Sequence, residues 1–129
     1  MKHLPTVAGG LLGLMFVVFG GMFLLDLVPA QEPPPEGSAL AHFMAAFAPT
    51  GYLTFVKVLE VLGGLLVAIP RTRNLGLLTL GPIIVNILAF HIFVTGGEGL
   101  LEPVILLICA IALYLLWVER AAFARLLTR

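Results

Sequence analysis

Polar side chains interrupt two long apolar stretches of this sequence. The stretch TFVKVLEVLGGLLVAI contains Lys57 and Glu60, and the stretch GPIIVNILAFHIFV contains Asn86 and His91. An ammonium, a carboxylate, an amide and an imidazole together offer hydrogen-bond donors and acceptors, which suit the polar head of a small ligand. Because ionisable groups are costly in a hydrocarbon environment, we expect these side chains to face the interior of the protein.

Each of these four residues also has a structural interpretation. Lys57 could extend its ammonium group to the membrane surface, and Glu60 could form a purely structural ion pair with Lys57, three residues earlier on the same helical face. Asn86 could join helices by hydrogen bonds or satisfy carbonyl groups freed by Pro82, four residues earlier. His91, near a helix end, could be a structural histidine. The sequence leaves these alternatives open.

The composition is that of a membrane protein. The chain has 129 residues, of which 60% are hydrophobic and 11% charged, and its mean hydropathy is +1.13. Soluble domains are roughly half apolar and about a quarter charged. Seven acidic residues balance seven basic ones, so no basic surface is expected to bind nucleic acid. With Cys109 as the single cysteine and no metal-binding spacing, we expect neither an internal disulfide nor a metal site.

Four apolar segments are each near the ~20 residues needed to cross a membrane. The sequence therefore predicts an all-α fold: one membrane domain (1–129) formed by an antiparallel bundle of four transmembrane helices. The first loop contains AHFMAAFAPTG, which is too short to span and is expected to form an interfacial helix. The predicted spans are 4–28, 52–69, 75–94 and 100–118, with an outer loop at 29–51 and an amphipathic basic tail at 119–129.

The distribution of basic residues predicts the orientation of the bundle. With four crossings the lysine and arginine residues outside the spans fall on one side, and Glu32, Glu36 and Glu98 fall on the other. Both termini are then cytoplasmic, in the inner membrane of a prokaryotic cell. The residues VPA before Gln31 could be a signal-cleavage site, but the preceding apolar stretch is longer than a signal core, so we expect it to be retained.

The predicted topology places all the polar candidates in the outer half of the bundle. Asp26 ends the first span and Glu102 begins the fourth at the same surface as Lys57, Glu60, Asn86 and His91, whereas no comparable set is expected in the inner half. Small residues that would let helices approach closely, together with a helix-interrupting proline, are Gly9, Gly13, Gly20, Gly63, Gly64 and Pro82.

The segments around Glu60 and His91 resemble the DoxX family of small four-helix membrane proteins. The resemblance rests on the pattern E-x-x-G-G from Glu60 to Gly64 and on the pattern P-x-x-x-N-x-x-x-x-H from Pro82 to His91. It implies an accessory subunit of a membrane oxidoreductase, such as the membrane partner of a thiosulfate:quinone oxidoreductase. Other relatives of that family act in receptor assembly or cargo transport, so the fold alone does not fix the function.

The sequence is compatible with three functions. In the first, the polar set binds the head of a quinone or a similar amphiphile, with lipid around the bundle and no covalently bound cofactor. In the second, the chain is a non-catalytic scaffold or assembly subunit of a larger membrane complex or homo-oligomer. The third is a small transporter, which the expected lack of polar residues in the inner half disfavours. In none of them is the chain expected to be an enzyme on its own.

Overall fold

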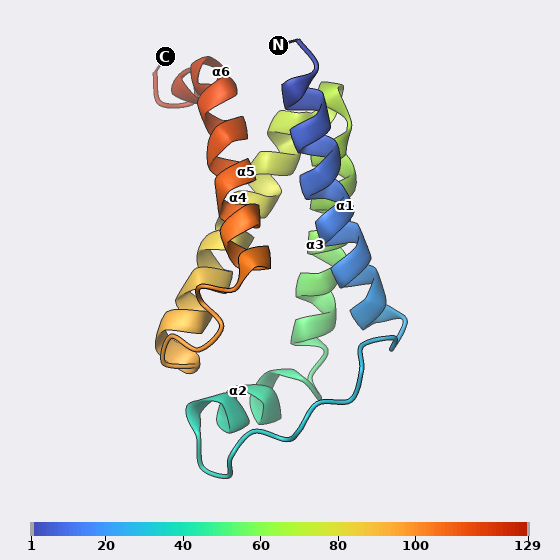
Figure 1. The fold of residues 1–129 in the computed structure, drawn as a ribbon, viewed down its shortest axis with the longest axis vertical. Coiled ribbons are helices and arrows are strands. Elements are labelled where there is room, and N and C mark those ends of the chain that lie inside the picture. Colours follow the sequence, from blue (N-terminus) through green and yellow to red (C-terminus); the bar gives the residue numbers. More distant parts are fainter. Residues whose placement is uncertain (1, 129) are drawn as a thin grey trace.

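A computed structural model describes residues 2–128, and within that part of the chain it contains helices and no strand. The predicted all-α class is therefore confirmed. Both ends of the chain lie at the same end of the molecule, which we call the terminal end, and the short helix α2 (Ala39–Phe47) lies at the other, which we call the α2 end (Figure 1).

Helices α1 (Leu4–Leu24) and α3 (Tyr52–Ala68) form the closest pair. A Cβ on Gly13 would clash with the carbonyl oxygen of Gly64, and a Cβ on Gly9 would lie 2.8 Å from the carbonyl oxygen of Val67. Only residues without a side chain allow the two backbones to approach this closely. The glycine seam on α1 consists of Gly9, Gly13 and Gly20.

The chain passes from α3 to α4 (Arg73–Ala89) through a single 3₁₀ turn, η1 (Pro70–Thr72). The hydroxyl of Thr72 donates to the carbonyl of Leu66 at 2.7 Å and so closes this turn. Near the turn α4 packs tightly on α3, because a Cβ on Gly63 would lie 2.7 Å from the Leu80 side chain and Gly76 lies against the backbone of Val67. These contacts hold α1, α3 and α4 together at the terminal end.

Towards the α2 end, α4 changes its helical geometry. Pro82 lies inside α4, and after Ala89 the helix continues as the π-helix η2 (Phe90–Val94), in which the amide of Thr95 donates to the carbonyl of Phe90 at 3.2 Å. Single π-helical turns inside α-helices occur frequently at functional sites.

Helix α5 (Pro103–Val118) contacts α1 and α4 and is followed by the short helix α6 (Arg120–Ala124). Its sequence contains no glycine, so it packs through side chains rather than by backbone contact. The buried hydrophobic core is formed by residues of α1, α3, α4 and α5: Leu12, Phe16, Val67, Leu77, Leu80, Ile84, Ile108, Ile111, Ala112 and Leu115.

Helix α2 lies across the α2 end of the bundle. Ser38 caps its first turn by accepting a hydrogen bond from the amide of Ala41 at 3.1 Å. Gly51, with a φ of 84°, lets the chain turn by 83° between α2 and α3. The ring of Phe43 then contacts the ring of Phe90 in η2, with the centroids 5.0 Å apart.

Within residues 2–128, two helical segments are long and apolar enough to cross a membrane, Leu4–Leu24 and Pro70–Val94. A third span is present if α2 and α3, which meet at a bend of 83°, cross the membrane together. Helix α5 is apolar but has 16 residues. The ends of the predicted spans are shifted: α1 ends at Leu24 rather than 28, and α5 begins at Pro103 rather than 100. Four membrane crossings therefore stay a prediction.

Candidate functional site

The α2 end of the bundle contains a cavity of about 540 Å³. Its wall is formed by α1, α2, the first half of α3, the second half of α4 with η2, and the first half of α5. Five of the six polar residues singled out in the sequence line this one cavity: Lys57, Glu60, Asn86, His91 and Glu102.

Lys57 and Glu60 form an ion pair on the wall contributed by α3. The distance from Lys57 Nζ to Glu60 Oε2 is 3.0 Å, and the side chains are 30% and 5% exposed. The ammonium group also lies 5.7 Å from the centre of the Phe23 ring, near the outer limit for a cation–π contact. The side chain of Lys57 is therefore turned towards Glu60 and is not extended away from the bundle to the membrane surface.

His91 and Asn86 contribute polar groups from the opposite wall. His91 Nδ1 lies 2.8 Å from the carbonyl oxygen of Ile87. Because a carbonyl can only accept, we assign the ring proton to Nδ1, which leaves Nε2 of the neutral ring as an acceptor. Asn86 lines the cavity one turn earlier and is exposed, not buried as the sequence predicts. Its amide can both donate and accept.

Glu102 and Asp26 differ in their positions. Glu102 precedes α5, and both its carboxylate and the His91 ring lie within 4 Å of the position that a Cβ on Gly99 would take. Both groups therefore lie near Gly99. Asp26 follows the last turn of α1 with a φ of 58°, is exposed and is absent from the cavity wall. The structure does not bring Asp26 to the other five residues.

The aromatic character of the cavity was not predicted. Five phenylalanine rings line it, from α1, α2 and η2: Phe16, Phe19, Phe23, Phe43 and Phe90. The three on α1 recur at a helical spacing of three to four residues, and this pattern could have indicated one aromatic face. The contribution of Phe43 depends on the bend at Gly51, so it could not be read from local sequence.

A second polar cluster lies at the terminal end and is formed by residues outside the predicted spans, Arg73, Asn74 and Glu119. Arg73 is 7% exposed and its Nη1 lies 3.4 Å from Glu119 Oε1. Within residues 2–128, Arg73 Nε, Arg73 Nη2 and Asn74 Oδ1 are buried side-chain atoms without a hydrogen-bond partner. The predicted spans leave Arg73 in the tight turn between residues 69 and 75, but η1 takes only three residues and α4 begins at Arg73 itself.

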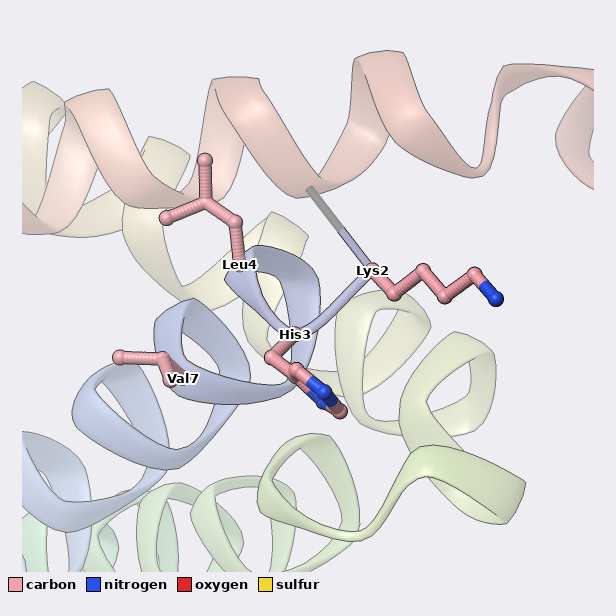
Figure 2. Close-up of a pocket in the computed structure, with 4 residues that line it drawn as sticks. All are labelled: Lys2, His3, Leu4 and Val7. Carbon is pink, nitrogen blue, oxygen red and sulfur yellow. The ribbon is translucent and has the colours of Figure 1, made fainter.

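A further hollow of about 490 Å³ lies at the start of α1 and is lined by Lys2, His3, Leu4 and Val7. Figure 2 shows that Leu4 and Val7 point away from Lys2 and His3, so these side chains do not converge. All four are exposed and come from one short segment. This surface does not have the form of a binding site.

Residues 2–128 contain no group of three or more His, Cys, Asp or Glu side chains placed to hold a metal ion. The cavity at the α2 end therefore offers an apolar, aromatic space with a few converging polar groups, which is the usual form of a site for a small organic molecule.

Comparison with known proteins finds a relative of this chain. No family model matches the chain, and no solved structure matches it. The resemblance to the DoxX family therefore stays a prediction. The chain is 32% identical over 130 residues to the uncharacterised protein YwoB of Bacillus subtilis (strain 168), and the match covers 95% of this chain and 80% of YwoB. At this identity and coverage, the chain belongs to the same protein family as YwoB.

Proposed function

We propose that this protein is a DoxX-like integral membrane protein that binds an amphiphile with a planar head, such as a quinone, as an accessory subunit of a membrane oxidoreductase. The observation that carries the proposal is the cavity at the α2 end, whose wall contains five phenylalanines together with the ion pair of Lys57 and Glu60 and with Asn86, His91 and Glu102.

The surface of the helices supports a membrane location. Large apolar side chains are exposed along every long helix, including Val7, Phe55, Val85 and Leu113, each at least 60% exposed. Soluble monomers rarely expose such extended apolar surface, whereas lipid would cover it. Because both termini lie at one end, an even number of crossings fits the fold (Figure 1). We propose four crossings in a prokaryotic inner membrane, with the terminal end in the cytoplasm.

The cavity suits a quinone in both of its redox states. Lys57 Nζ and the amide of Asn86 can donate hydrogen bonds to a quinone carbonyl, and His91 Nε2 can accept one from a quinol hydroxyl. Phenylalanine rings provide faces for offset stacking on a planar head group. An apolar tail could leave between the helices into lipid. As an accessory subunit, the chain would bind the quinone while a partner subunit carries out the oxidation.

The scaffold function remains the second candidate, because one observation favours it. Lys57 and Glu60 satisfy each other at 3.0 Å, so the most buried charge in the cavity does not need a ligand. If the chain is a scaffold, the polar residues hold the helices together and the exposed helix faces bind a larger membrane complex.

Quinone content of the purified protein separates the two functions. We expect His91→Ala to lower the amount of co-purified quinone roughly tenfold, because a hydrogen bond to the head is lost. We expect Glu60→Gln to lower it similarly, because Lys57, a donor to the head, loses the ion-pair partner that positions its ammonium group. Matched controls are Glu98→Gln and His42→Ala, which change exposed residues outside the cavity wall and should keep the wild-type content. If the two cavity variants keep their quinone but lose thermal stability, the scaffold function is correct.

Impermeant thiol labelling tests the orientation, in a Cys109→Ser background. Ser38→Cys should react from outside sealed cells and Thr72→Cys should not. The reverse pattern would invert the proposed topology.

A further inference from the structure

The polar cluster at the terminal end makes the third function, that of a transporter, testable. The sequence disfavoured transport because it predicted no comparable polar set in the inner half of the bundle, and the structure brings Arg73, Asn74 and Glu119 together at the terminal edge of that half. We propose that α5 and α6 form a gate, held closed by the contact between Arg73 and Glu119, whose opening connects the cavity to the terminal end. This inference rests on the proposed ligand site and adds that the bound amphiphile can reach both ends of the bundle.

The helices divide into a rigid part and a part that can move. Backbone contacts at glycine join α1 to α3 at Gly13 and Gly64, and α3 to α4 at Gly76 and Val67. Helix α5 has no glycine and is held by the side chains of Ile108, Ile111, Ala112 and Leu115 against α1 and α4. Contacts between side chains can slide, whereas interlocked backbones cannot without separating the helices.

The polar contact that closes the terminal end is weak. Within residues 2–128, one side-chain hydrogen bond joins the α5–α6 segment to another long helix. In it, Arg73 Nη1 donates to Glu119 Oε1 at 3.4 Å. This is longer than the usual charge-assisted hydrogen bond. Arg73 is buried, yet its Nε and Nη2 have no partner, and a Cβ on Gly9 would lie only 3.3 Å from Nε. Buried donors without partners destabilise the closed state, and water admitted by opening would satisfy them.

The ends of α5 allow a rocking motion. The loop before α5 contains three glycines with positive φ, Gly96, Gly97 and Gly99, so it can absorb a change in the direction of the helix. Ile108 lies between the two ends of α5 and belongs both to the cavity wall and to the buried core. Rocking about Ile108 would open α5 at the terminal end and narrow the cavity at the α2 end.

Reciprocal changes in thiol accessibility test this gate without any ligand. In a Cys109→Ser background, Asn74→Cys reports on the terminal end and Ile105→Cys reports on the cavity. Adding Glu119→Gln should raise the labelling rate at position 74 and lower it at position 105, each by at least about fivefold, because one equilibrium controls both ends. Glu98→Gln, an exposed carboxylate in the loop before α5, should change neither rate.

The charge exchange Arg73→Glu with Glu119→Arg should restore both rates towards those of the unaltered pair, whereas a merely unstable protein would label faster at both positions. Faster labelling at 74 without slower labelling at 105 means local fraying and overturns the gate. Unchanged rates at both positions also overturn it. If the gate fails while the purified protein keeps its quinone, the proposed ligand site stands and only the second opening is lost.

Discussion

The two ends of the bundle differ in how closely their helices pack. At the terminal end, Leu12, Val67, Leu80 and Leu115 are completely buried, and glycines bring helix backbones into contact. At the α2 end the same helices diverge around a cavity of about 540 Å³ with ionisable groups in its wall (Figure 1). The comparison indicates that the glycine contacts among α1, α3 and α4 at the terminal end stabilise the fold and that the α2 end provides the capacity to bind.

The largest effect is expected from filling the glycine seam at the terminal end. In Gly13→Val the new Cβ would meet the carbonyl oxygen of Gly64 and lie 2.8 Å from the Ala68 Cβ, so α1 and α3 must separate. We expect the free energy of unfolding to fall by about 3 kcal/mol or more. Equilibrium unfolding in mixed detergent micelles measures it.

Gly10→Val is the matched control, because a Cβ on Gly10 meets nothing within 4 Å. It should change the stability by less than about 0.5 kcal/mol. Equal losses in the two variants would show that α1 and α3 do not pack through this seam.

A smaller effect is expected from truncating one leucine at each end. Leu80→Ala removes a completely buried side chain, and we expect a loss of about 2 to 4 kcal/mol from the cavity left behind. Leu53→Ala enlarges a cavity that already exists, so it should cost less than about 1 kcal/mol. The same unfolding assay compares them, and a cost for Leu53→Ala equal to that for Leu80→Ala would remove the distinction between the two ends.

The sequence predicts much of the terminal-end architecture and part of the α2 end. Apolar runs located α1, α3, α4 and α5 within a few residues, because a helix buried in lipid or protein needs a continuous apolar sequence. The depth of Lys57, Glu60, Asn86 and His91 followed from the rise of a helix, and these residues do line one cavity.

Residues whose environment depends on turns were predicted less well. Asp26 was assigned to the polar set, but α1 ends two residues before it and the chain turns away with a φ of 58°. Arg73 was assigned to a loop, but a 3₁₀ turn of three residues places it in the first turn of α4, beneath α1. Turn geometry and tertiary contact decide such positions, and neither is visible in a hydropathy pattern.

The smallest effect on stability is expected at α2. None of the nine residues of α2 is fully buried, although Phe43 covers the cavity and contacts Phe90. Phe43→Ala should lower the free energy of unfolding by less than about 1 kcal/mol. It should nevertheless release bound quinone faster, which exchange against an excess of a short-chain quinone would measure. Phe55→Ala, on the outer face of α3 and 60% exposed, should leave the exchange rate unchanged.

The most direct test of the ligand site is photolabelling with a quinone analogue that carries a photoreactive group on its head, followed by mass spectrometry of the labelled peptides. We predict labels on cavity-lining residues of α3, η2 and α5, such as Leu53, Phe90 and Ile105, and competition by unmodified quinone. Labels spread over outward residues such as Phe55, Leu65 and Val85, without competition, would mean that the probe samples only the lipid-facing surface and would contradict the account.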